Sequence, residues 1–474
     1  MICYLLFIPS FADSNGDGIG DLPGIISRLD YLRDLGADSI WLTPIHSSPS
    51  YHKYDTTDYY SVAPEYGTLE DLHRLVKEAH QRNIKVLLDL VLNHCSWQHP
   101  FFLNAVSSMN SKYRNWFVWE EPANITTYQE QWHLSPLLND DQYYFGHFWK
   151  GMPDFNYDIQ EVRDEAIRIA AYWIEQGIDG FRLDAAKHIF PNEREPENHR
   201  WWREFRSAIE KMKQDFYLVG EVADKCEIIS PYLDYAFNCC FNFELAENII
   251  ESVNESKHLH LAPWLVDIYQ TYAKDDARFR DAIFLSNHDQ DRVATRLHND
   301  IRKIKMAANI LFTLPGDVYI YYGEELGMTG EKPDEQIREP FLWDANDTAL
   351  TRWVKPIYST LATIATLSAQ KNDMQSIYHH YHKLIEFRNT ILKDITYKMK
   401  DAEYGPEILA YSLFDDSFEY LLLHNLSPRT IRPTLSIPKE AIIYLLNKKV
   451  MHTGKKIVLA GFESILIKEP IIKA

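Results

Sequence analysis

The segment GFRLDAAKH, residues 180–188, decides how the rest of the chain is interpreted. It follows a long amphipathic run and places Arg182 and Asp184 two residues apart in an otherwise apolar, strand-like stretch. Side chains two residues apart share one face of a strand, so the sequence predicts a cation beside a carboxylate. Such a neighbour favours the ionised form that a nucleophilic carboxylate needs, although a structural ion pair in a core strand is the simpler alternative.

Buried strands and amphipathic helices alternate on both sides of this segment. Strands are predicted near residues 4–11, 39–45, 84–94, 215–222, 282–292 and 316–327, and helices over 22–35, 68–82, 161–179, 199–213, 301–314 and 376–389. This order is typical of a parallel α/β architecture. In barrels of that architecture the chemistry lies at the C-terminal ends of the strands.

Two regions break the alternation and predict further domains. Residues 95–157 are rich in Trp, Tyr, Phe, His and Asn and lack a strong period, which indicates an inserted domain. From about residue 394 short alternating strands separated by turn residues indicate an all-β C-terminal domain, 394–474. The α/β unit then comprises residues 1–94 and 158–393.

Charge and composition exclude several classes of partner. The 474 residues carry 49 basic and 68 acidic side chains, a formal net charge of −19 that repels phosphate, so no nucleic-acid partner is expected. No apolar run reaches membrane-spanning length, so no membrane partner is expected either. We expect a monomer. The aromatic content, 14% of the residues, suits the faces of sugars as well as a core.

The cysteines and the N-terminus predict a cytoplasmic protein. Cys3, Cys95, Cys226, Cys239 and Cys240 are odd in number and show no paired spacing, which predicts reduced thiols. The apolar start MICYLLFIPSFA resembles a signal peptide but has no positive n-region, and cleavage there would remove the first predicted strand. A secreted form that has lost its leader is the alternative.

The segment DSNGDGIGD, residues 13–21, predicts a structural Ca²⁺ site. Oxygen donors fall at the first, third, fifth, seventh and ninth positions of a calcium-binding loop: Asp13, Asn15, Asp17, the carbonyl of Ile19, and Asp21. Gly24 stands where an EF-hand needs its bidentate glutamate, so the loop is not an EF-hand. A solvated Asp/Asn/Gly turn is the alternative.

Three of the predicted strands end in carboxylates, Asp184, Glu221 and Asp289. Because unpaired buried charge is costly, three such residues are not expected of folding alone. Two carboxylates flanking one bond can cleave a glycosidic linkage: one attacks the anomeric carbon, and the other, kept protonated, gives its proton to the leaving oxygen. A separation of roughly 5–5.5 Å between them corresponds to retention of configuration.

The segments DLVLNH, GFRLDAAKH, GEV and LSNHD resemble, in order, the four motif regions of the α-amylase family of glycoside hydrolases. The resemblance covers essentially the whole chain. It implies a (β/α)8 TIM barrel with a domain inserted after strand 3 and a C-terminal all-β sandwich. It also implies that Asp184 is the nucleophile that forms a covalent glycosyl-enzyme, Glu221 the general acid/base, and Asp289 the carboxylate that binds and distorts the sugar in the −1 subsite.

The same resemblance implies a set of substrate-binding residues. These are Arg182, His94 and His288, which hold the −1 sugar; Tyr54 in HKYD, the stacking tyrosine; Lys187 and His188, which contact the leaving-group side; and Arg338, which reaches the −1 sugar or forms a plain salt bridge. A carboxylate needs burial or a negative neighbour to stay protonated near neutrality. We therefore expect a raised pKa for Glu221, with Asp289 as a possible cause.

The details of the motifs favour α-1,4 bonds in starch, maltodextrins or maltooligosaccharides. Ala185 follows the nucleophile where the family's α-1,6-glucosidases usually have Val, and MPDFN, residues 152–156, resembles the fifth motif of a group intermediate between oligo-1,6-glucosidases and neopullulanases. Exo-acting members often have an aspartate shortly before the stacking tyrosine, where this chain has SYHK. We expect an endo-acting enzyme. The alternatives are an exo-acting α-glucosidase or oligo-1,6-glucosidase, a transglycosylase, and a non-catalytic carbohydrate-binding barrel.

Overall fold

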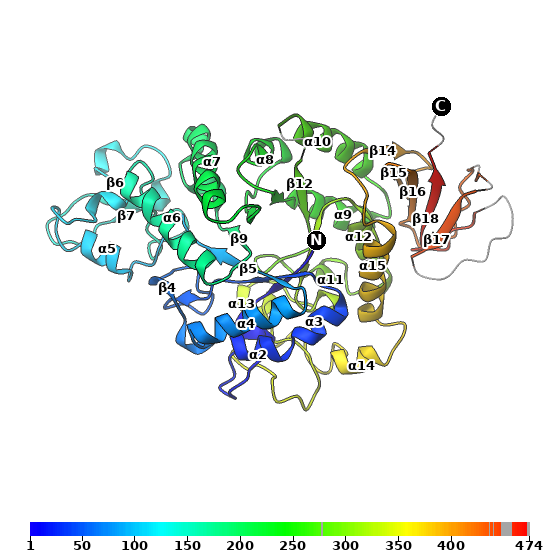
Figure 1. The fold of residues 1–474 in the computed structure, drawn as a ribbon, viewed down its shortest axis with the longest axis horizontal. Helices are drawn as coiled ribbons and strands as arrows, with labels where there is room; N and C mark the ends of the chain where they lie inside the picture. Colours follow the sequence, from blue (N-terminus) through cyan, green and yellow to red (C-terminus); the bar gives the residue numbers. More distant parts are fainter. Residues whose placement is uncertain (276–277, 436, 439, 447–456, 472–474) are drawn as a thin grey trace.

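The computed structural model describes residues 1–275, 278–435, 437–438, 440–446 and 457–471 (Figure 1). Eight parallel strands form a closed barrel in the order β1-β13-β12-β11-β10-β9-β5-β2, which confirms the predicted TIM barrel. Their bounds are β1 Ile2–Leu6, β2 Ser39–Leu42, β5 Lys85–Leu90, β9 Gly180–Leu183, β10 Tyr217–Gly220, β11 Cys239–Phe241, β12 Arg280–Ile283 and β13 Asp317–Tyr321. Strands in a barrel covered by helices are buried on both faces, which explains their nearly continuous apolar sequences.

Helices surround the barrel. The longer ones are α4 Leu69–Gln81, α6 Gln160–Glu175, α7 Glu195–Met212, α9 Phe243–Glu255, α10 Leu261–Asp275, α12 Ile301–Thr313 and α15 Ile377–Ile391. Shorter ones are α2 Leu22–Ser27, α3 Leu29–Leu35, α8 Cys226–Leu233, α11 Val293–Arg296, α13 Asp334–Ile337 and α14 Leu367–Lys371. Thr68 caps α4: its hydroxyl accepts from the Asp71 amide, and the Asp71 carboxylate accepts from the Thr68 amide.

Two expectations about these elements were wrong in detail, and one strand was not predicted. The apolar run 4–11 is not one strand, because β1 ends at Leu6 and Ile8–Phe11 forms a helical turn, α1. The helix expected over 22–35 breaks at Arg28 into α2 and α3. Strand β11 was not predicted, because a strand of three residues is too short to show an alternating hydrophobic pattern.

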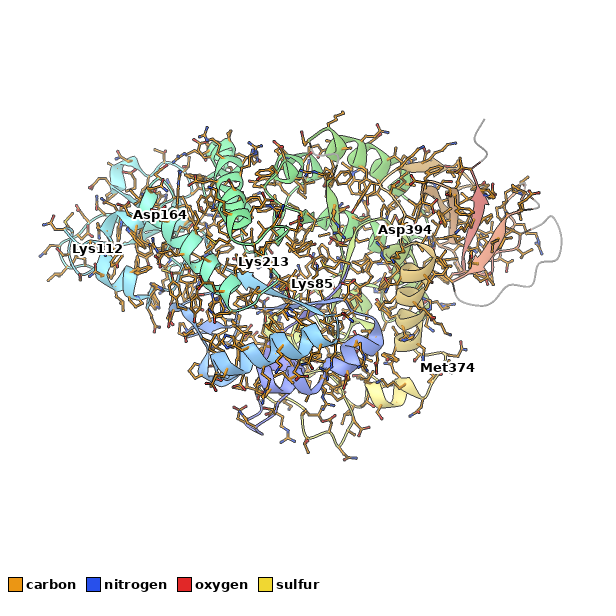
Figure 2. All side chains as sticks on the ribbon, in the orientation of Figure 1. Lys85, Lys112, Asp164, Lys213, Met374 and Asp394 are labelled. Carbon is orange, nitrogen blue, oxygen red and sulfur yellow. The ribbon has the colours of Figure 1, made fainter. Side chains whose placement is uncertain are left out.

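Between β5 and α6 the chain leaves the barrel and builds a small separate layer. It contains α5 Pro100–Ala105 and a three-stranded antiparallel sheet, β6 Trp119–Glu120, β8 Tyr143–Phe145 and β7 Trp132–Leu134. A two-stranded ribbon, β3 His46–Ser47 with β4 Asp58–Val62, precedes it. Figure 2 labels Lys112 at the far end of this inserted segment.

The predicted all-β C-terminal domain is confirmed as one five-stranded antiparallel sheet among the described residues. Its order is β14 Met399–Ala402, β15 Ile408–Phe414, β16 Phe418–Asn425, β18 Ser464–Pro470 and β17 Ile442–Leu445. One face packs on the barrel, where Asn309 of α12 donates to the Ser464 hydroxyl at 2.9 Å. Ile431 and Leu459 pair over the other face and supply its covering layer. Asp394, labelled in Figure 2, lies at the junction.

All five cysteines are buried as free thiols. Within the described ranges, no helix is both long enough and apolar enough to cross a membrane.

Candidate active site

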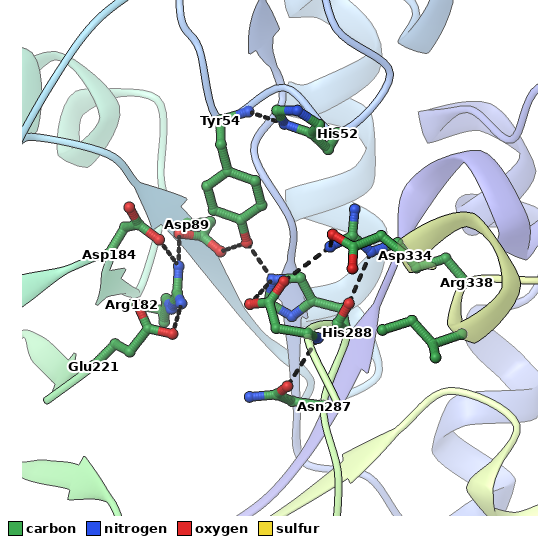
Figure 3. A network of polar contacts seen from close by, with 12 residues as sticks. His52, Tyr54, Asp89, Arg182, Asp184, Glu221, Asn287, His288, Asp334 and Arg338 are labelled. Atoms are coloured by element: carbon green, nitrogen blue, oxygen red, sulfur yellow. Dashed lines mark hydrogen bonds and ion pairs between the residues drawn. The ribbon is translucent and has the colours of Figure 1, made fainter. Parts of the chain in front are cut away.

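Arg182 lies at the C-terminal mouth of the barrel among three carboxylates (Figure 3). Its Nη1 donates to Asp89 Oδ1 at 2.8 Å and to Asp184 Oδ1 at 2.5 Å, and its Nη2 pairs with Glu221 Oε1 at 2.5 Å. The three carboxylates come from the neighbouring strands β5, β9 and β10, or directly follow them. The predicted pairing of Arg182 with Asp184 is confirmed, and Arg182 itself is 1% exposed.

Asp89 belongs to this cluster although sequence reasoning did not include it among the site residues. It is fully buried and directly opposite Arg182 in the β5–β9 register. Its second oxygen accepts from the Tyr54 hydroxyl at 2.9 Å and from the Trp41 indole at 3.2 Å. The signal for it was a single aspartate inside the apolar run KVLLDLVL, because a charge in a buried strand needs a buried partner.

Asp289 stands apart from the Arg182 cluster and pairs with Arg338; burial lowers the pKa of its other neighbour, His288, to about 3, so that ring is neutral near pH 7. Arg338 Nη2 pairs with its Oδ1 at 2.8 Å and His288 Nε2 lies 3.1 Å from its Oδ2. Arg338 also donates to the His288 carbonyl at 2.8 Å, which fixes both side chains. Burial acts to raise the pKa of Asp289, but His288, Arg338 and Arg182 outweigh it and lower that pKa below its usual value.

Burial raises the pKa of Glu221 to about 7. Arg182 opposes this shift, while Asp184 and then Asp289 add to it. The expected direction is therefore found, with burial as its main cause and Asp289 as a lesser one. Burial also raises the pKa of Asp184, against the effect of Arg182. The sequence predicted Arg182 beside Asp184, but it did not predict how deeply the two side chains are buried.

A cavity of about 320 Å³ opens over these groups. Six of the residues that the sequence assigned to catalysis or substrate binding line it: Tyr54, His94, Asp184, Glu221, Asp289 and Arg338. The cavity is also lined by residues that were not assigned: His52, Phe148, Trp149, Met152 and Asp334. Four of these lie on loops and Asp334 begins the short helix α13; a linear sequence does not reveal how such segments run in space.

Four assigned residues lie beneath or beside this cavity instead of lining it. Arg182 and His288 are buried below the carboxylates. Lys187 forms an ion pair with Asp224 at 2.5 Å. The His188 ring stacks on His147, with ring centroids 3.9 Å apart.

Side chains of the loop of residues 13–21 form hydrogen bonds with the main chain of the same loop and of the helix that follows. Asp13 accepts from the amides of Asn15, Gly16 and Gly18 at 2.7–3.0 Å. Asp21 caps α2 through the Gly24 amide at 2.6 Å. In the part of the chain that the structure describes, no three His, Cys, Asp or Glu side chains gather into a metal-binding group.

The fold and the arrangement of carboxylates at the barrel mouth are those of a barrel glycoside hydrolase. The family model for the alpha-amylase catalytic domain matches residues 5–396, and the chain belongs to this family. It is therefore an alpha-amylase-type glycoside hydrolase.

Named relatives cover almost the whole chain. "Alpha-amylase 3" of Dictyoglomus thermophilum is 41% identical, with 99% of this chain and 93% of the relative aligned. A "4-alpha-glucanotransferase" of Thermotoga neapolitana is 33% identical, over 90% of this chain and 96% of the relative. The crystal structure of an alpha-amylase from H. orenii superposes with a TM-score of 0.92 at 40% identity, covering 99% of both chains.

Proposed function

We propose that this enzyme hydrolyses α-1,4-glucosidic bonds in starch, maltodextrins or maltooligosaccharides with retention of configuration. The observation that carries the proposal is the guanidinium of Arg182, whose two terminal nitrogens hold Asp184 and Glu221 at 2.5 Å each. Carboxylates bound to one planar group lie close together. This favours the shorter spacing of retaining enzymes, roughly 5–5.5 Å, over the wider spacing that leaves room for a water molecule.

In the first step Asp184 attacks the anomeric carbon and forms a covalent bond to it. The glycosidic bond breaks as Glu221 gives its proton to the departing oxygen, so the leaving chain departs as a neutral alcohol. In the second step Glu221 takes a proton from water, the water oxygen attacks the same carbon, and Asp184 is released as a carboxylate. Two inversions at one carbon leave its configuration unchanged.

The other lining residues would hold the −1 sugar during these steps. Asp289, which stays ionised beside Arg338, can accept from sugar hydroxyls. The Tyr54 ring, fixed through its hydroxyl to Asp89, supplies an apolar face, and burial lowers the pKa of His94 to about 4, so that His94 binds as a neutral donor or acceptor.

Two observations support α-1,4-glucan as the substrate. The relative from Dictyoglomus thermophilum carries the name of an alpha-amylase, and Ala185 stands after the proposed nucleophile. The glucanotransferase relative favours a second candidate reaction, transfer of the glycosyl group to another sugar. A sugar hydroxyl can attack the covalent intermediate in place of water. An exo-acting α-glucosidase or oligo-1,6-glucosidase remains the other alternative.

Incubation with soluble starch, maltoheptaose and isomaltose, analysed over time, tests the reaction and its mode. We expect a spread of short maltooligosaccharides from starch and no cleavage of isomaltose. Glucose released one unit at a time, or rapid cleavage of isomaltose, would contradict the α-1,4 endo proposal. Products longer than the maltoheptaose supplied would instead identify the transferase.

Replacing the proposed nucleophile tests its role. Asp184→Asn keeps the size of the side chain and an oxygen for Arg182 but cannot form the glycosyl-enzyme, so kcat should fall by at least about 10⁴-fold with little change in Tm. The matched control is Asp30→Asn, which removes a carboxylate from an exposed pair with Arg82 on the outer helix α3 and should retain full activity. Near-normal turnover by Asp184→Asn would exclude the assignment.

The raised pKa of Glu221 predicts the alkaline limb of the pH profile. Because its folded pKa is about 7, Glu221 is protonated below that pH and loses its proton as the pH rises through it. For maltoheptaose, kcat/KM should therefore fall above about pH 7. With α-maltosyl fluoride, whose leaving group needs less help from an acid, the decline should be smaller. An alkaline decline of equal size for both substrates would exclude Glu221 as its cause.

We propose further that the loop of residues 13–21 binds Ca²⁺. Asp13, Asn15, Asp17, Asp21 and the Ile19 carbonyl would hold the ion, which would crosslink a loop joining β1 to α2. An all-oxygen donor set suits this cation. Among the ion pairs of the described residues, none involves Asp13, Asp17 or Asp21, so their negative charge has no basic side chain to balance it.

Chelation tests the calcium proposal. EDTA should lower Tm by a few degrees and added Ca²⁺ should restore it, because a ligand that binds only the folded state stabilises it. Asp17→Ala, at an exposed position of the loop, should make Tm insensitive to both additions. Identical melting curves of the wild type with EDTA and with Ca²⁺ would contradict the proposal.

A further inference from the structure

Arg338 stands on a short segment that other parts of the chain must hold in place. Its guanidinium pairs with Asp289 at 2.8 Å and donates to the His288 carbonyl at 2.8 Å. Arg338 directly follows α13, a helix of only four residues. So short a helix has little stability of its own, and the carbonyls at its end have no partners within it. The position of Arg338 therefore depends on contacts from outside the helix.

Buried side chains bind the carbonyls on both sides of Arg338. The Ile337 carbonyl accepts from Nε of Arg292 at 2.9 Å and from the Tyr321 hydroxyl at 3.0 Å. The Tyr322 hydroxyl donates to the Glu339 carbonyl at 2.7 Å. Because β13 ends at Tyr321 and Tyr322 directly follows it, two of these donors are carried by the end of a barrel strand.

The carbonyl of Arg338 itself is bound from the neighbouring strand. The Ser10 hydroxyl donates to it, and Ser10 lies in α1, the helical turn that follows β1, the lateral partner of β13. The Ser10 hydroxyl also accepts from the Trp353 indole at 2.7 Å. Three consecutive carbonyls, those of residues 337–339, thus each accept from a buried side chain. The four side chains are here called the carbonyl clamp: Ser10, Arg292, Tyr321 and Tyr322.

Arg292 makes the largest number of contacts in the clamp. It is 1% exposed, and its guanidinium carbon lies 4.3 Å and 4.6 Å from the ring centroids of Tyr321 and Tyr322. Besides the Ile337 carbonyl, it binds the Tyr322 carbonyl through Nη1 at 2.8 Å. A planar guanidinium suits this place, because it can donate to two carbonyls while it lies against aromatic rings.

The carboxylate of Glu339 fixes the main chain beyond Arg338. It is fully buried and accepts from the amides of Ile357 at 2.6 Å, Tyr358 at 3.0 Å and Ser359 at 2.6 Å. Glu339 is thus held both through its carbonyl and through its side chain. The main chain on either side of Arg338 cannot shift without breaking buried hydrogen bonds, whose loss is costly.

We propose that the carbonyl clamp positions Arg338 for the reaction, and that Arg338 in turn holds Asp289 where it meets the −1 sugar. The clamp side chains are positioning residues, because none of the four lines the catalytic cavity. The Arg338 side chain is long, so a shift of its main chain would carry the guanidinium away from Asp289. A displacement of about 1 Å is enough to lower a rate about 100-fold. This inference rests on the proposed function, in which Asp289 binds the substrate.

A double-mutant cycle on kcat/KM for maltoheptaose separates positioning from folding. Tyr321→Phe/Tyr322→Phe removes two clamp hydroxyls, keeps both rings and should lower kcat/KM about tenfold. Arg338→Ala removes the guanidinium and should lower kcat/KM about 100-fold. With all three changes together, kcat/KM should stay within about twofold of that of Arg338→Ala, because the clamp then has no guanidinium to position.

The matched control is Tyr269→Phe. Tyr269 is 3% exposed, and its hydroxyl donates to the Pro315 carbonyl at 3.4 Å, before the start of β13 and at the other end of this strand from the clamp. This change should lower Tm slightly and leave kcat/KM within about twofold. If Tyr321→Phe/Tyr322→Phe does not fold at the assay temperature, Tyr322→Phe, which loses a single hydroxyl, replaces it in the cycle.

The outcomes distinguish the clamp from the reaction itself. Losses that multiply, to about 1,000-fold with all three changes, would show that the clamp does not act through Arg338 and would overturn the proposal. Unchanged kinetics of the clamp variant or of Arg338→Ala would overturn it as well. A wild-type enzyme that does not cleave maltoheptaose would overturn the proposed function and the role of the clamp with it, whereas wild-type cleavage with multiplied losses overturns the clamp alone.

Discussion

One guanidinium shared by three buried carboxylates is the constraint on which this site depends. Arg182 can neutralise one negative charge, yet it bonds to Asp89, Asp184 and Glu221. If all three were ionised, the cluster would hold excess charge away from water, which is costly. Near neutrality the cluster therefore retains protons, and the pKa values of Asp89 and Glu221 are both raised to about 7. Because the groups interact strongly, they titrate as one unit.

The barrel makes this charge arrangement possible by bringing neighbouring strand ends together. Asp89 and Arg182 are lateral partners of β5 and β9, and Glu221 follows β10, the next strand. Asp289 follows β12, on the far side of β11, where the pairing with Arg338 favours its ionised form. The carboxylates around Arg182 therefore retain a proton near neutral pH, whereas Asp289 stays ionised. An acid and a charged anchor can then function at the same pH.

The parts that sequence predicted well are those with a local signal. Asp184, Glu221 and Asp289 each follow an apolar run in the sequence, and this position predicted that they lie together at the strand ends. The alternation of strands and helices predicted the barrel. Asp89 was harder to assign to the site from the sequence, because only its burial distinguishes it from a surface aspartate. Phe148 and Trp149 reach the cavity on a loop, and Asp334 at the start of α13, along paths that depend on distant contacts. The raised pKa of Asp184 was also not predicted. The sequence shows the neighbouring Arg182, which lowers this pKa, but it does not show the burial that raises it.

The charged groups and most of the aromatic wall of the cavity come from different parts of this chain. The charged groups stand on or directly after barrel strands, whose register fixes their geometry. Most of the aromatic wall of the cavity comes from the segment inserted between β5 and α6, which is joined to the barrel mouth by the bridge between His94 and Asp154. Because the barrel strands fix the Arg182 cluster, the inserted segment can change its side chains without moving that cluster. Substitutions in the inserted segment can therefore reshape the wall of the cavity while its charged groups stay in place.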